Sequence, residues 1–190
     1  MILLIDCGSD TTTNIAHIID DYCDVKTIPL LDFNKDKDLE EIQGIILSSG
    51  SLLLTEIDPE KYLDQLEWVT ETELPVLGIN LGHVLIGLLF GGYVSRARDN
   101  VDWQTIEAYE DCILFNRLPN EIEMRENSSE TVSIAPGFQL VASSDSCVNE
   151  IMQHKEKAIF GVQFHPEVSG NHGSILIENF VNHCIRPSYH

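Results

Sequence analysis

The sequence has 190 residues, of which 43% are hydrophobic, so it is long enough to bury a core of ordinary size. It has 11 Lys and Arg residues and 31 Asp and Glu residues, which gives a formal net charge of -20 at pH 7. Such an excess of negative charge repels phosphate groups and anionic lipid headgroups, so the composition argues against binding to nucleic acid or to a membrane surface.

The cysteines and the apolar runs indicate a reducing compartment. The five cysteines are scattered without a CxxC pair, which predicts neither a disulfide framework nor a zinc site. The apolar run 1–5 ends at Asp6 without a basic flank, unlike a signal peptide, and no apolar stretch reaches the roughly 18 residues of a membrane span. We therefore expect a cytoplasmic protein with no metal ion and no cofactor.

The first half of the chain alternates short apolar runs with amphipathic segments. Strands are predicted over 2–5, 25–30, 44–47 and 76–79, helices over 11–22 and 59–70, and a short exposed helix or loop over 36–41. This alternation predicts an α/β fold, an open and mostly parallel sheet with helices on both faces in three layers, as in flavodoxin. Because ligands bind at the carboxyl ends of such strands, we expect Cys7, Gly50 and Asn80 along one rim.

The segment from Pro75 to Gly92 is the most informative in the chain. It predicts a buried strand, a tight turn with a glycine two positions either side of Asn80, and an apolar helix that ends at a pair of glycines. A turn of this kind is the nucleophile elbow, which holds its central residue in a strained conformation above the sheet. In an enzyme, that central residue attacks the substrate.

Beyond residue 92 the pattern changes to short segments of alternating or β-branched character. They cover 93–97, 106–109, 121–124, 131–134, 140–143, 151–153 and 158–163. Together with the turn residues between them they predict a short antiparallel or mixed extension of the sheet. A last helix is predicted over 174–184, and no linker interrupts the chain. We interpret residues 1–190 as a single domain.

Two motifs resemble those of the class I glutamine amidotransferases. The elbow over 78–82 is similar to the family's Gly-x-Cys-x-Gly, and residues 160–168, Phe-Gly-Val-Gln-Phe-His-Pro-Glu-Val, are similar to the segment that carries its catalytic His and Glu. The motifs occur in the family's order, and the resemblance extends over essentially the whole chain. Within the family the sequence looks most like the glutaminase subunit of GMP synthase, with the anthranilate synthase and carbamoyl phosphate synthetase glutaminases as more distant candidates.

The resemblance implies a role for several residues. His165 would be the base that accepts a proton from a Cys nucleophile, and Glu167 would orient its imidazole. The backbone N–H groups of Leu81 and Gly50 would form the oxyanion hole, which does not depend on side-chain identity.

Several positions depart from the family pattern. The nucleophile position holds Asn80, whose carboxamide has no ionisable proton and cannot form a thioester. Val84 stands where the family often has Gln, and 127–130, which include Ser128, align with a Ser-His-x-Asp segment. The loop 48–51 reads Ser-Ser-Gly-Ser where the family has Ser-Gly-Gly-Pro. These departures indicate that recognition of glutamine is lost, which leaves the ligand unknown.

The sequence supports more than one function. The first interpretation is a glutamine amidotransferase-like domain with a degenerate catalytic triad, which does not hydrolyse glutamine and acts as a binding or regulatory partner of an ATP-dependent synthetase. The alternative is a working enzyme: either a GMP-synthase-type glutaminase subunit that delivers ammonia, or a hydrolase of another small molecule. That hydrolase would use His165 with an activated water or with a relocated nucleophile such as Cys7, although a buried structural cysteine is the simpler interpretation. A third interpretation is a small-molecule sensor that uses Asn80 as a hydrogen-bonding group.

His83, at the start of an apolar helix, is interpreted as a packed residue.

Overall fold

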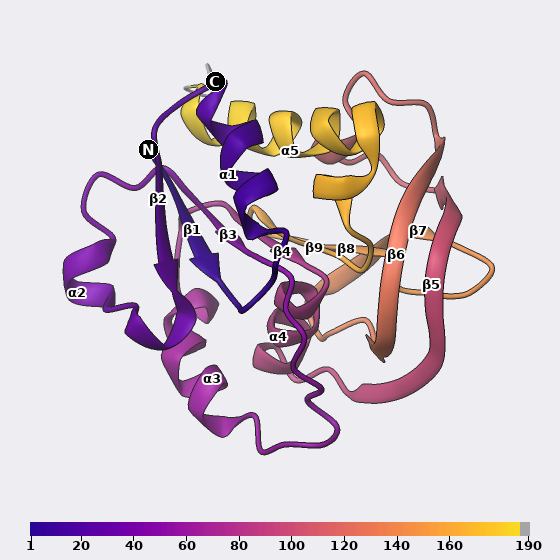
Figure 1. Ribbon diagram of the computed structural model, residues 1–190, viewed down its shortest axis with the longest axis horizontal. Helices are drawn as coiled ribbons and strands as arrows, with labels where there is room; N and C mark the ends of the chain where they lie inside the picture. Colours follow the sequence, from indigo (N-terminus) through magenta and orange to yellow (C-terminus); the bar gives the residue numbers. More distant parts are fainter. Residues whose placement is uncertain (187–190) are drawn as a thin grey trace.

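The strands form one mixed sheet. The computed structural model describes residues 1–186, and residues 98–101 by their backbone alone. The described residues form a nine-stranded sheet in the order β2-β1-β3-β4-β9-β8-β7-β5-β6 (Figure 1). The strands are β1 (Ile2–Asp6), β2 (Val25–Pro29), β3 (Gly44–Leu47), β4 (Val76–Ile79), β5 (Val94–Ala108), β6 (Glu121–Val132), β7 (Phe138–Ser143), β8 (Ile151–His154) and β9 (Ile159–Val162).

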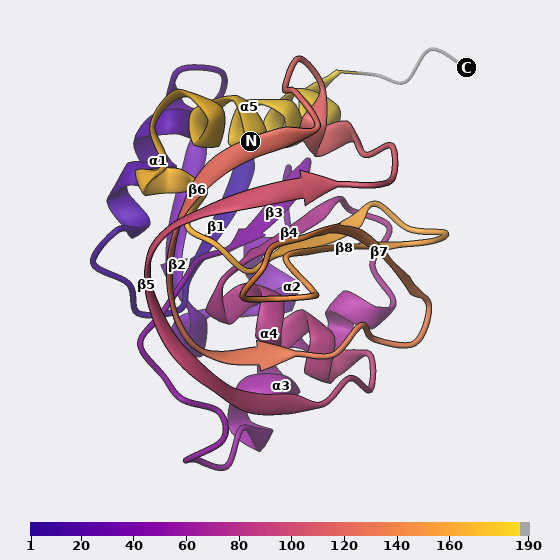
Figure 2. The ribbon, with the colours of Figure 1, turned by 90° about the vertical axis from the view of Figure 1, so that its right-hand side faces the viewer.

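Helices cover both faces of the parallel part of the sheet. The helices are α1 (Thr12–Asp20), α2 (Lys35–Asp38), α3 (Glu60–Leu66), α4 (Leu81–Leu89) and α5 (Gly170–Ile185), and single 3₁₀ turns include η3 (Ile113–Phe115) and η4 (Pro166–Val168). Figure 2 shows α1 and α5 on one side of the sheet and α3 and α4 on the other. The predicted α/β fold in three layers is confirmed.

The core lies on both faces of the sheet because the inner parallel strands β1, β3, β4 and β9 are buried at almost every position. In β1, Leu3 and Ile5 pack into the cluster beneath α3 and α4, whereas Ile2 and Leu4 pack into the cluster beneath α1 and α5. All four side chains are fully buried. This explains why the sequence shows these strands as continuous apolar runs and not as an alternating pattern.

The antiparallel part of the sheet is longer than the sequence predicts. Residues 94–108 form one strand and residues 121–132 another, where the sequence predicts four separate short segments. The inward positions of β6 include the polar residues Glu126, Ser128 and Glu130, which interrupt the apolar alternation. In β5 the pairing register shifts between Arg96 and Asn100, which breaks the pattern again. The resulting hairpin curves around one side of the molecule (Figure 2).

The ends of the helices also differ from the predicted ranges. The last helix begins at Gly170 and not at Ser174, because η4 leads almost directly into α5. In the described part of the chain, none of the helices has the length and apolar character needed to cross a membrane.

Candidate functional site

Asn80 lies in the tight turn between β4 and α4. Its φ of 50° and ψ of -103° lie outside the regions that residues with side chains normally adopt. A Cβ on Gly78 would lie 2.5 Å from the carbonyl of Gly82, and a Cβ on Gly82 would lie 2.5 Å from the carbonyl oxygen of Leu47. Only glycine fits at both positions, so the crossing of strand and helix holds Asn80 at the carboxyl end of β4.

The carboxamide of Asn80 is fixed by both of its N–H groups. Nδ2 donates to Oγ of Ser128 over 2.8 Å and to the backbone oxygen of Gln163 over 2.9 Å. The side chain does not cap α4, and its Oδ1 accepts no hydrogen bond from the described residues. Because Asn80 is only 8% exposed, its amide is a fixed polar part of the site, with the oxygen left for a ligand or a water molecule.

Ser128 is the centre of a small network of amide groups. Its Oγ also accepts from Nε2 of Gln163 over 2.7 Å, and the same nitrogen donates to the backbone oxygen of Glu130 over 3.0 Å. Oε1 of Gln163 is buried and has no hydrogen-bond partner among the described residues. Sequence reasoning did not single out Gln163, although it lies two residues before His165 in the second motif.

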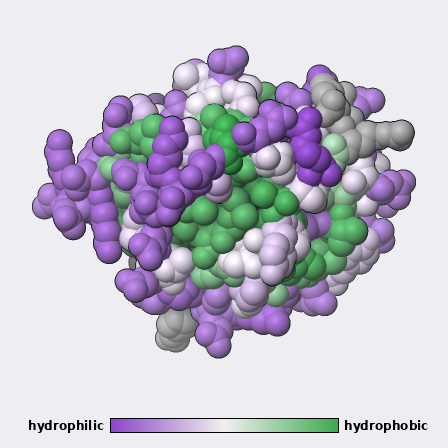
Figure 3. Space-filling view, turned by 90° about the horizontal axis from the view of Figure 1, so that it is seen from below, coloured by the Kyte–Doolittle hydropathy of each residue, from purple (hydrophilic) through white to green (hydrophobic). Residues whose placement is uncertain are grey.

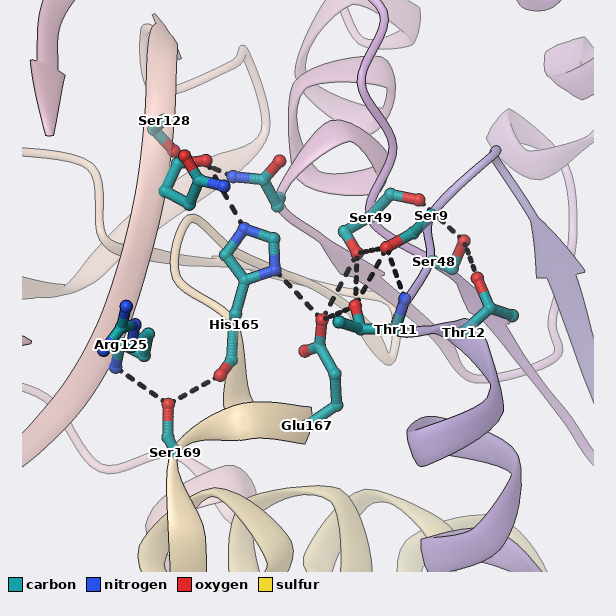
Figure 4. Close-up of polar contacts among 12 residues, drawn as sticks. Ser9, Thr11, Thr12, Ser48, Ser49, Arg125, Ser128, His165, Glu167 and Ser169 are labelled. Atoms are coloured by element: carbon teal, nitrogen blue, oxygen red, sulfur yellow. Dashed lines mark hydrogen bonds and ion pairs between the residues drawn. The ribbon is translucent and has the colours of Figure 1, made fainter. Parts of the chain in front are cut away.

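His165 is held on two sides of its ring. Nδ1 lies 2.9 Å from Oε1 of Glu167, and Nε2 lies 3.4 Å from the backbone oxygen of Asn127 in β6 (Figure 4). A carboxylate only accepts hydrogen bonds, so Nδ1 carries a hydrogen toward Glu167. Nε2 donates to the Asn127 carbonyl only in the imidazolium form. The structure therefore brings His165 and Glu167 together in the arrangement that the resemblance implies.

The carboxylate of Glu167 receives hydroxyl donors that no motif indicates. Its Oε1 accepts from Oγ1 of Thr11 over 2.7 Å and from Oγ of Ser49 over 3.3 Å (Figure 4). Its Oε2 is buried without a partner among the described residues. Thr11 follows β1 and Ser49 follows β3, so only the assembled sheet brings these hydroxyls to the carboxylate.

Gly50 and Leu81 line one cleft with Asn80. A Cβ on Gly50 would lie 2.3 Å from the carbonyl oxygen of Cys7 and 2.6 Å from Cδ2 of Leu81, so the loop after β3 contacts both neighbouring segments. Leu81 is the first residue of α4, and its N–H has no partner within the helix. The two residues that the resemblance assigns to the oxyanion hole thus lie side by side, and their role stays a prediction.

Val84 and Glu130 also line this cleft, and neither presents a free polar group to it. Val84 is apolar and 3% exposed. The Glu130 carboxylate accepts from the backbone nitrogen of Leu54 over 2.9 Å, from that of Thr55 over 2.7 Å, and from the Thr55 hydroxyl. The carboxylate that aligns with the family's Asp therefore holds the chain's own loop, which supports the prediction that ligand recognition has changed.

Two further residues from the sequence analysis are packed in the core. The Cys7 thiol is directed at the backbone oxygen of Ile5 over 3.7 Å, and burial together with the charge of Asp6 raises its pKa to about 12. A thiol that stays protonated is a poor nucleophile, so the structure argues against Cys7 as a relocated nucleophile. His83 is fully buried, and burial lowers its pKa to about 3, in agreement with a packed neutral ring.

The cleft has a volume of about 550 Å³ and lies at the carboxyl ends of the parallel strands. Its acidic and basic lining side chains are Asp10, Arg125, Glu130 and His165. Among the side chains that the structure describes, which leave out those of residues 98–101, no three His, Cys, Asp or Glu residues are grouped so that they could hold a metal ion. Seen from below in the orientation of Figure 1, the surface has an apolar patch surrounded by polar residues (Figure 3).

The sequence matches a known family over nearly its whole length. The model of the class-I glutamine amidotransferases matches residues 3–184. The chain is 42% identical over 148 residues to a subunit of the glutamine-hydrolysing GMP synthase of Methanococcus maripaludis strain C5, covering 76% of this chain and 75% of that protein. It is 38% identical over 162 residues to the corresponding protein of Methanocaldococcus jannaschii, covering 83% of this chain and 81% of the relative.

Solved structures show the same likeness. The crystal structure of a putative GMP synthase subunit from Thermoplasma acidophilum superposes with a TM-score of 0.87 at 28% identity, covering 96% of this chain and 92% of that one. A glutamine amidotransferase from Thermotoga maritima superposes with a TM-score of 0.75 at 19% identity, covering 96% and 83% of the two chains, and supports the fold alone.

Proposed function

Because the chain belongs to the class I glutamine amidotransferase family and is homologous to a subunit of GMP synthase, we propose that it is a member of this family that no longer hydrolyses glutamine. It acts instead as a binding or regulatory subunit. Covalent hydrolysis needs a nucleophile at the elbow, and the elbow here carries a carboxamide.

The hydrogen bonding of Asn80 is the observation that carries this proposal. Its amide nitrogen is tied to Ser128 and to the backbone of Gln163, so it is part of a polar network and not a side chain free to move. The engagement of Glu130 with Leu54 and Thr55 supports the same conclusion, because the aligned acidic group is occupied within the protein.

We propose that the partner is an ATP-dependent synthetase subunit. The relatives are described as one lettered subunit of GMP synthase, a name that implies at least one other subunit in those proteins. In this chain, the apolar patch of Figure 3 is the kind of surface that contacts another protein. The net charge of -20 favours a partner with a basic surface.

A working glutaminase subunit is the second candidate function. The close contact between His165 and Glu167 favours it, because that pair is the base of the family's reaction. The N–H of Leu81, which has no partner within α4, also favours it. This candidate requires a nucleophile. The described residues that line the cleft include no cysteine, so they supply no thiol for this role.

Release of ammonia and glutamate from glutamine tests the proposal. The purified protein is assayed alone and with a candidate synthetase subunit, beside the variants Asn80→Cys and His165→Ala. We expect the wild type to stay at background in both settings. We expect Asn80→Cys to stay at background as well, because it supplies an attacking sulfur but leaves Val84 and Glu130 unchanged.

Two results would change this interpretation. Wild-type hydrolysis that His165→Ala abolishes would establish the second candidate function and require a replacement nucleophile. Hydrolysis by Asn80→Cys alone would show that the glutamine site is intact and that only the attacking atom is missing.

A further inference from the structure

We propose that Thr11 and Ser49 are positioning residues that hold Glu167 against His165. Their hydroxyls come from the loops after β1 and β3 and meet the carboxylate on the side away from β6 (Figure 4). We call Ser9, Thr11 and Ser49 the hydroxyl clamp. The clamp fixes the carboxylate, and the carboxylate in turn fixes the tautomer and orientation of the imidazole.

The hydrogen bonds of the clamp run in one direction. Thr11 donates its hydroxyl hydrogen to Oε1 of Glu167 over 2.7 Å, so its oxygen accepts from Oγ of Ser9 over 2.8 Å. Ser9 in turn accepts from Oγ of Ser49 over 2.8 Å, and Ser49 shares this single hydrogen with Oε1 of Glu167 at the longer distance of 3.3 Å. Each hydroxyl therefore polarises the next toward the carboxylate, and such chains strengthen every bond in them.

Burial makes these donors necessary. The Glu167 side chain has no exposed surface, and its Oε2 has no partner among the described residues. A buried carboxylate needs hydrogen-bond donors in place of the water it has lost. Oε1 has three such neighbours, two of which are clamp hydroxyls and one the His165 ring.

The neighbouring residues provide matched controls because they carry the same groups but bind elsewhere. Thr12 donates its hydroxyl to Asp6 over 2.8 Å and does not contact Glu167. Ser48 donates to the backbone oxygen of Ser49 over 2.8 Å and accepts from the backbone nitrogen of Cys7. The pairs Thr11 with Thr12 and Ser49 with Ser48 thus separate the clamp from the general polar packing of the two loops.

The inference rests on the proposed function in one respect: with Asn80 at the elbow, the state of the His165–Glu167 pair cannot be followed through turnover. It is followed by nuclear magnetic resonance of protein labelled with ¹⁵N-histidine. The signal of the His165 Nδ1 hydrogen is assigned by its loss in His165→Gln. Its rate of exchange with water is then measured in Thr11→Val, Ser49→Ala and Thr11→Ser, and in the controls Thr12→Val and Ser48→Ala.

We expect a slowly exchanging Nδ1 hydrogen in the wild type. Its exchange should accelerate about tenfold or more in Thr11→Val, because one hydrogen bond to the carboxylate is lost. The acceleration should be smaller in Ser49→Ala, and Thr11→Ser should retain the wild-type rate. Both control variants should keep the wild-type exchange rate of the Nδ1 hydrogen, even where they lower the thermal stability of the protein.

The proposal is overturned if Thr11→Val keeps the wild-type rate, if the controls accelerate exchange equally, or if the wild type shows no protected Nδ1 hydrogen. Should Thr11→Val fail to fold, the comparison of Ser49→Ala with Ser48→Ala decides in the same way. Ammonia release from glutamine by the wild type would contradict the proposed function and leave the clamp standing, so the two failures are distinguishable.

Discussion

At the scale of single residues, the elbow combines an unusual backbone with an unusual side chain. Asn80 combines a positive φ with a ψ of -103°, outside the left-handed region that asparagine tolerates, so the packing around the turn maintains a strained backbone. Its amide nitrogen bonds Ser128 and the backbone oxygen of Gln163, which links the elbow to β6 and to the end of β9. The residue thus stabilises the site that a cysteine would use for chemistry.

The glycines of the elbow give the first prediction. In Gly78→Ala, the new Cβ would lie 2.5 Å from the carbonyl of Gly82, and neither backbone segment can move without disturbing the sheet. We expect a loss of about 3 kcal/mol or more in the free energy of unfolding, measured by urea denaturation.

Gly8→Ala is the control for this prediction. Gly8 lies in the loop after β1 with a φ of 94°, and a Cβ there would meet no atom within 4 Å. The only cost of Gly8→Ala is the backbone strain at this positive φ, so we expect a smaller loss of about 1 kcal/mol in the free energy of unfolding. Equal losses in the two variants would show that close approach of the backbone does not set the cost at Gly78.

At the scale of elements, β6 orients the second motif. It is the last strand of the sheet, and the segment that contains His165 forms hydrogen bonds along its outer edge. The backbone oxygen of Arg125 accepts from the His165 nitrogen over 2.8 Å, while the Arg125 nitrogen donates to Oγ of Ser169 over 2.8 Å. Ser169 also donates to the backbone oxygen of His165 over 2.6 Å. An edge that no further strand pairs with is in this way used to place an imidazole.

The same strand holds the loop after β3, which gives a prediction for Glu130. In Glu130→Gln, one acceptor oxygen is replaced by an NH₂ group that faces the donors of Leu54 and Thr55. We expect a loss of about 1–2 kcal/mol in the free energy of unfolding. We also expect faster amide hydrogen exchange at Leu54 and Thr55.

Glu123→Gln is the matched control on the same strand. The Glu123 side chain lies on the exposed face, where it bonds the Thr105 hydroxyl. We expect it to leave hydrogen exchange at residues 54 and 55 unchanged. Unchanged exchange in Glu130→Gln as well would show that the carboxylate does not hold the loop.

At the scale of the whole molecule, a buried acid makes stability depend on pH. Glu150 has no exposed surface, and one of its carboxyl oxygens accepts from the Ser144 hydroxyl over 2.6 Å. Burial and the nearby Glu126 raise the pKa of Glu150 from the ordinary 4.5 to about 8. The folded state therefore binds this proton more tightly than the unfolded state does.

The sign of the pH effect follows from that difference. Stability from the protonated Glu150 is fully present below pH 4.5 and is lost as the pH rises toward about 8. We expect the wild type to lose stability relative to Glu150→Gln by about 1.4 kcal/mol per pH unit within this window. Urea denaturation of both proteins between these pH values measures the difference, and parallel curves would contradict the assignment.

The sequence by itself determined the parts of the protein that are encoded locally. The strand, turn and helix around Asn80 are visible because the spacing of glycines and the apolar runs lie within 18 residues, from Pro75 to Gly92. The second motif likewise placed His165 and Glu167 close together, since only one residue separates them. The α/β fold followed from the alternation of buried strands and helices.

The tertiary structure alone decided what depends on contacts between distant segments. Thr11 and Glu167 are 156 positions apart, and Glu130 and Thr55 are 75 apart, so no local pattern could indicate these bonds. The length of β6 could not be predicted for a related reason. Its inward polar residues look like a break in the strand, because their hydrogen-bond partners belong to distant segments of the sequence. Local patterns determine the elements, whereas the surroundings of a buried polar group exist only after the sheet has assembled.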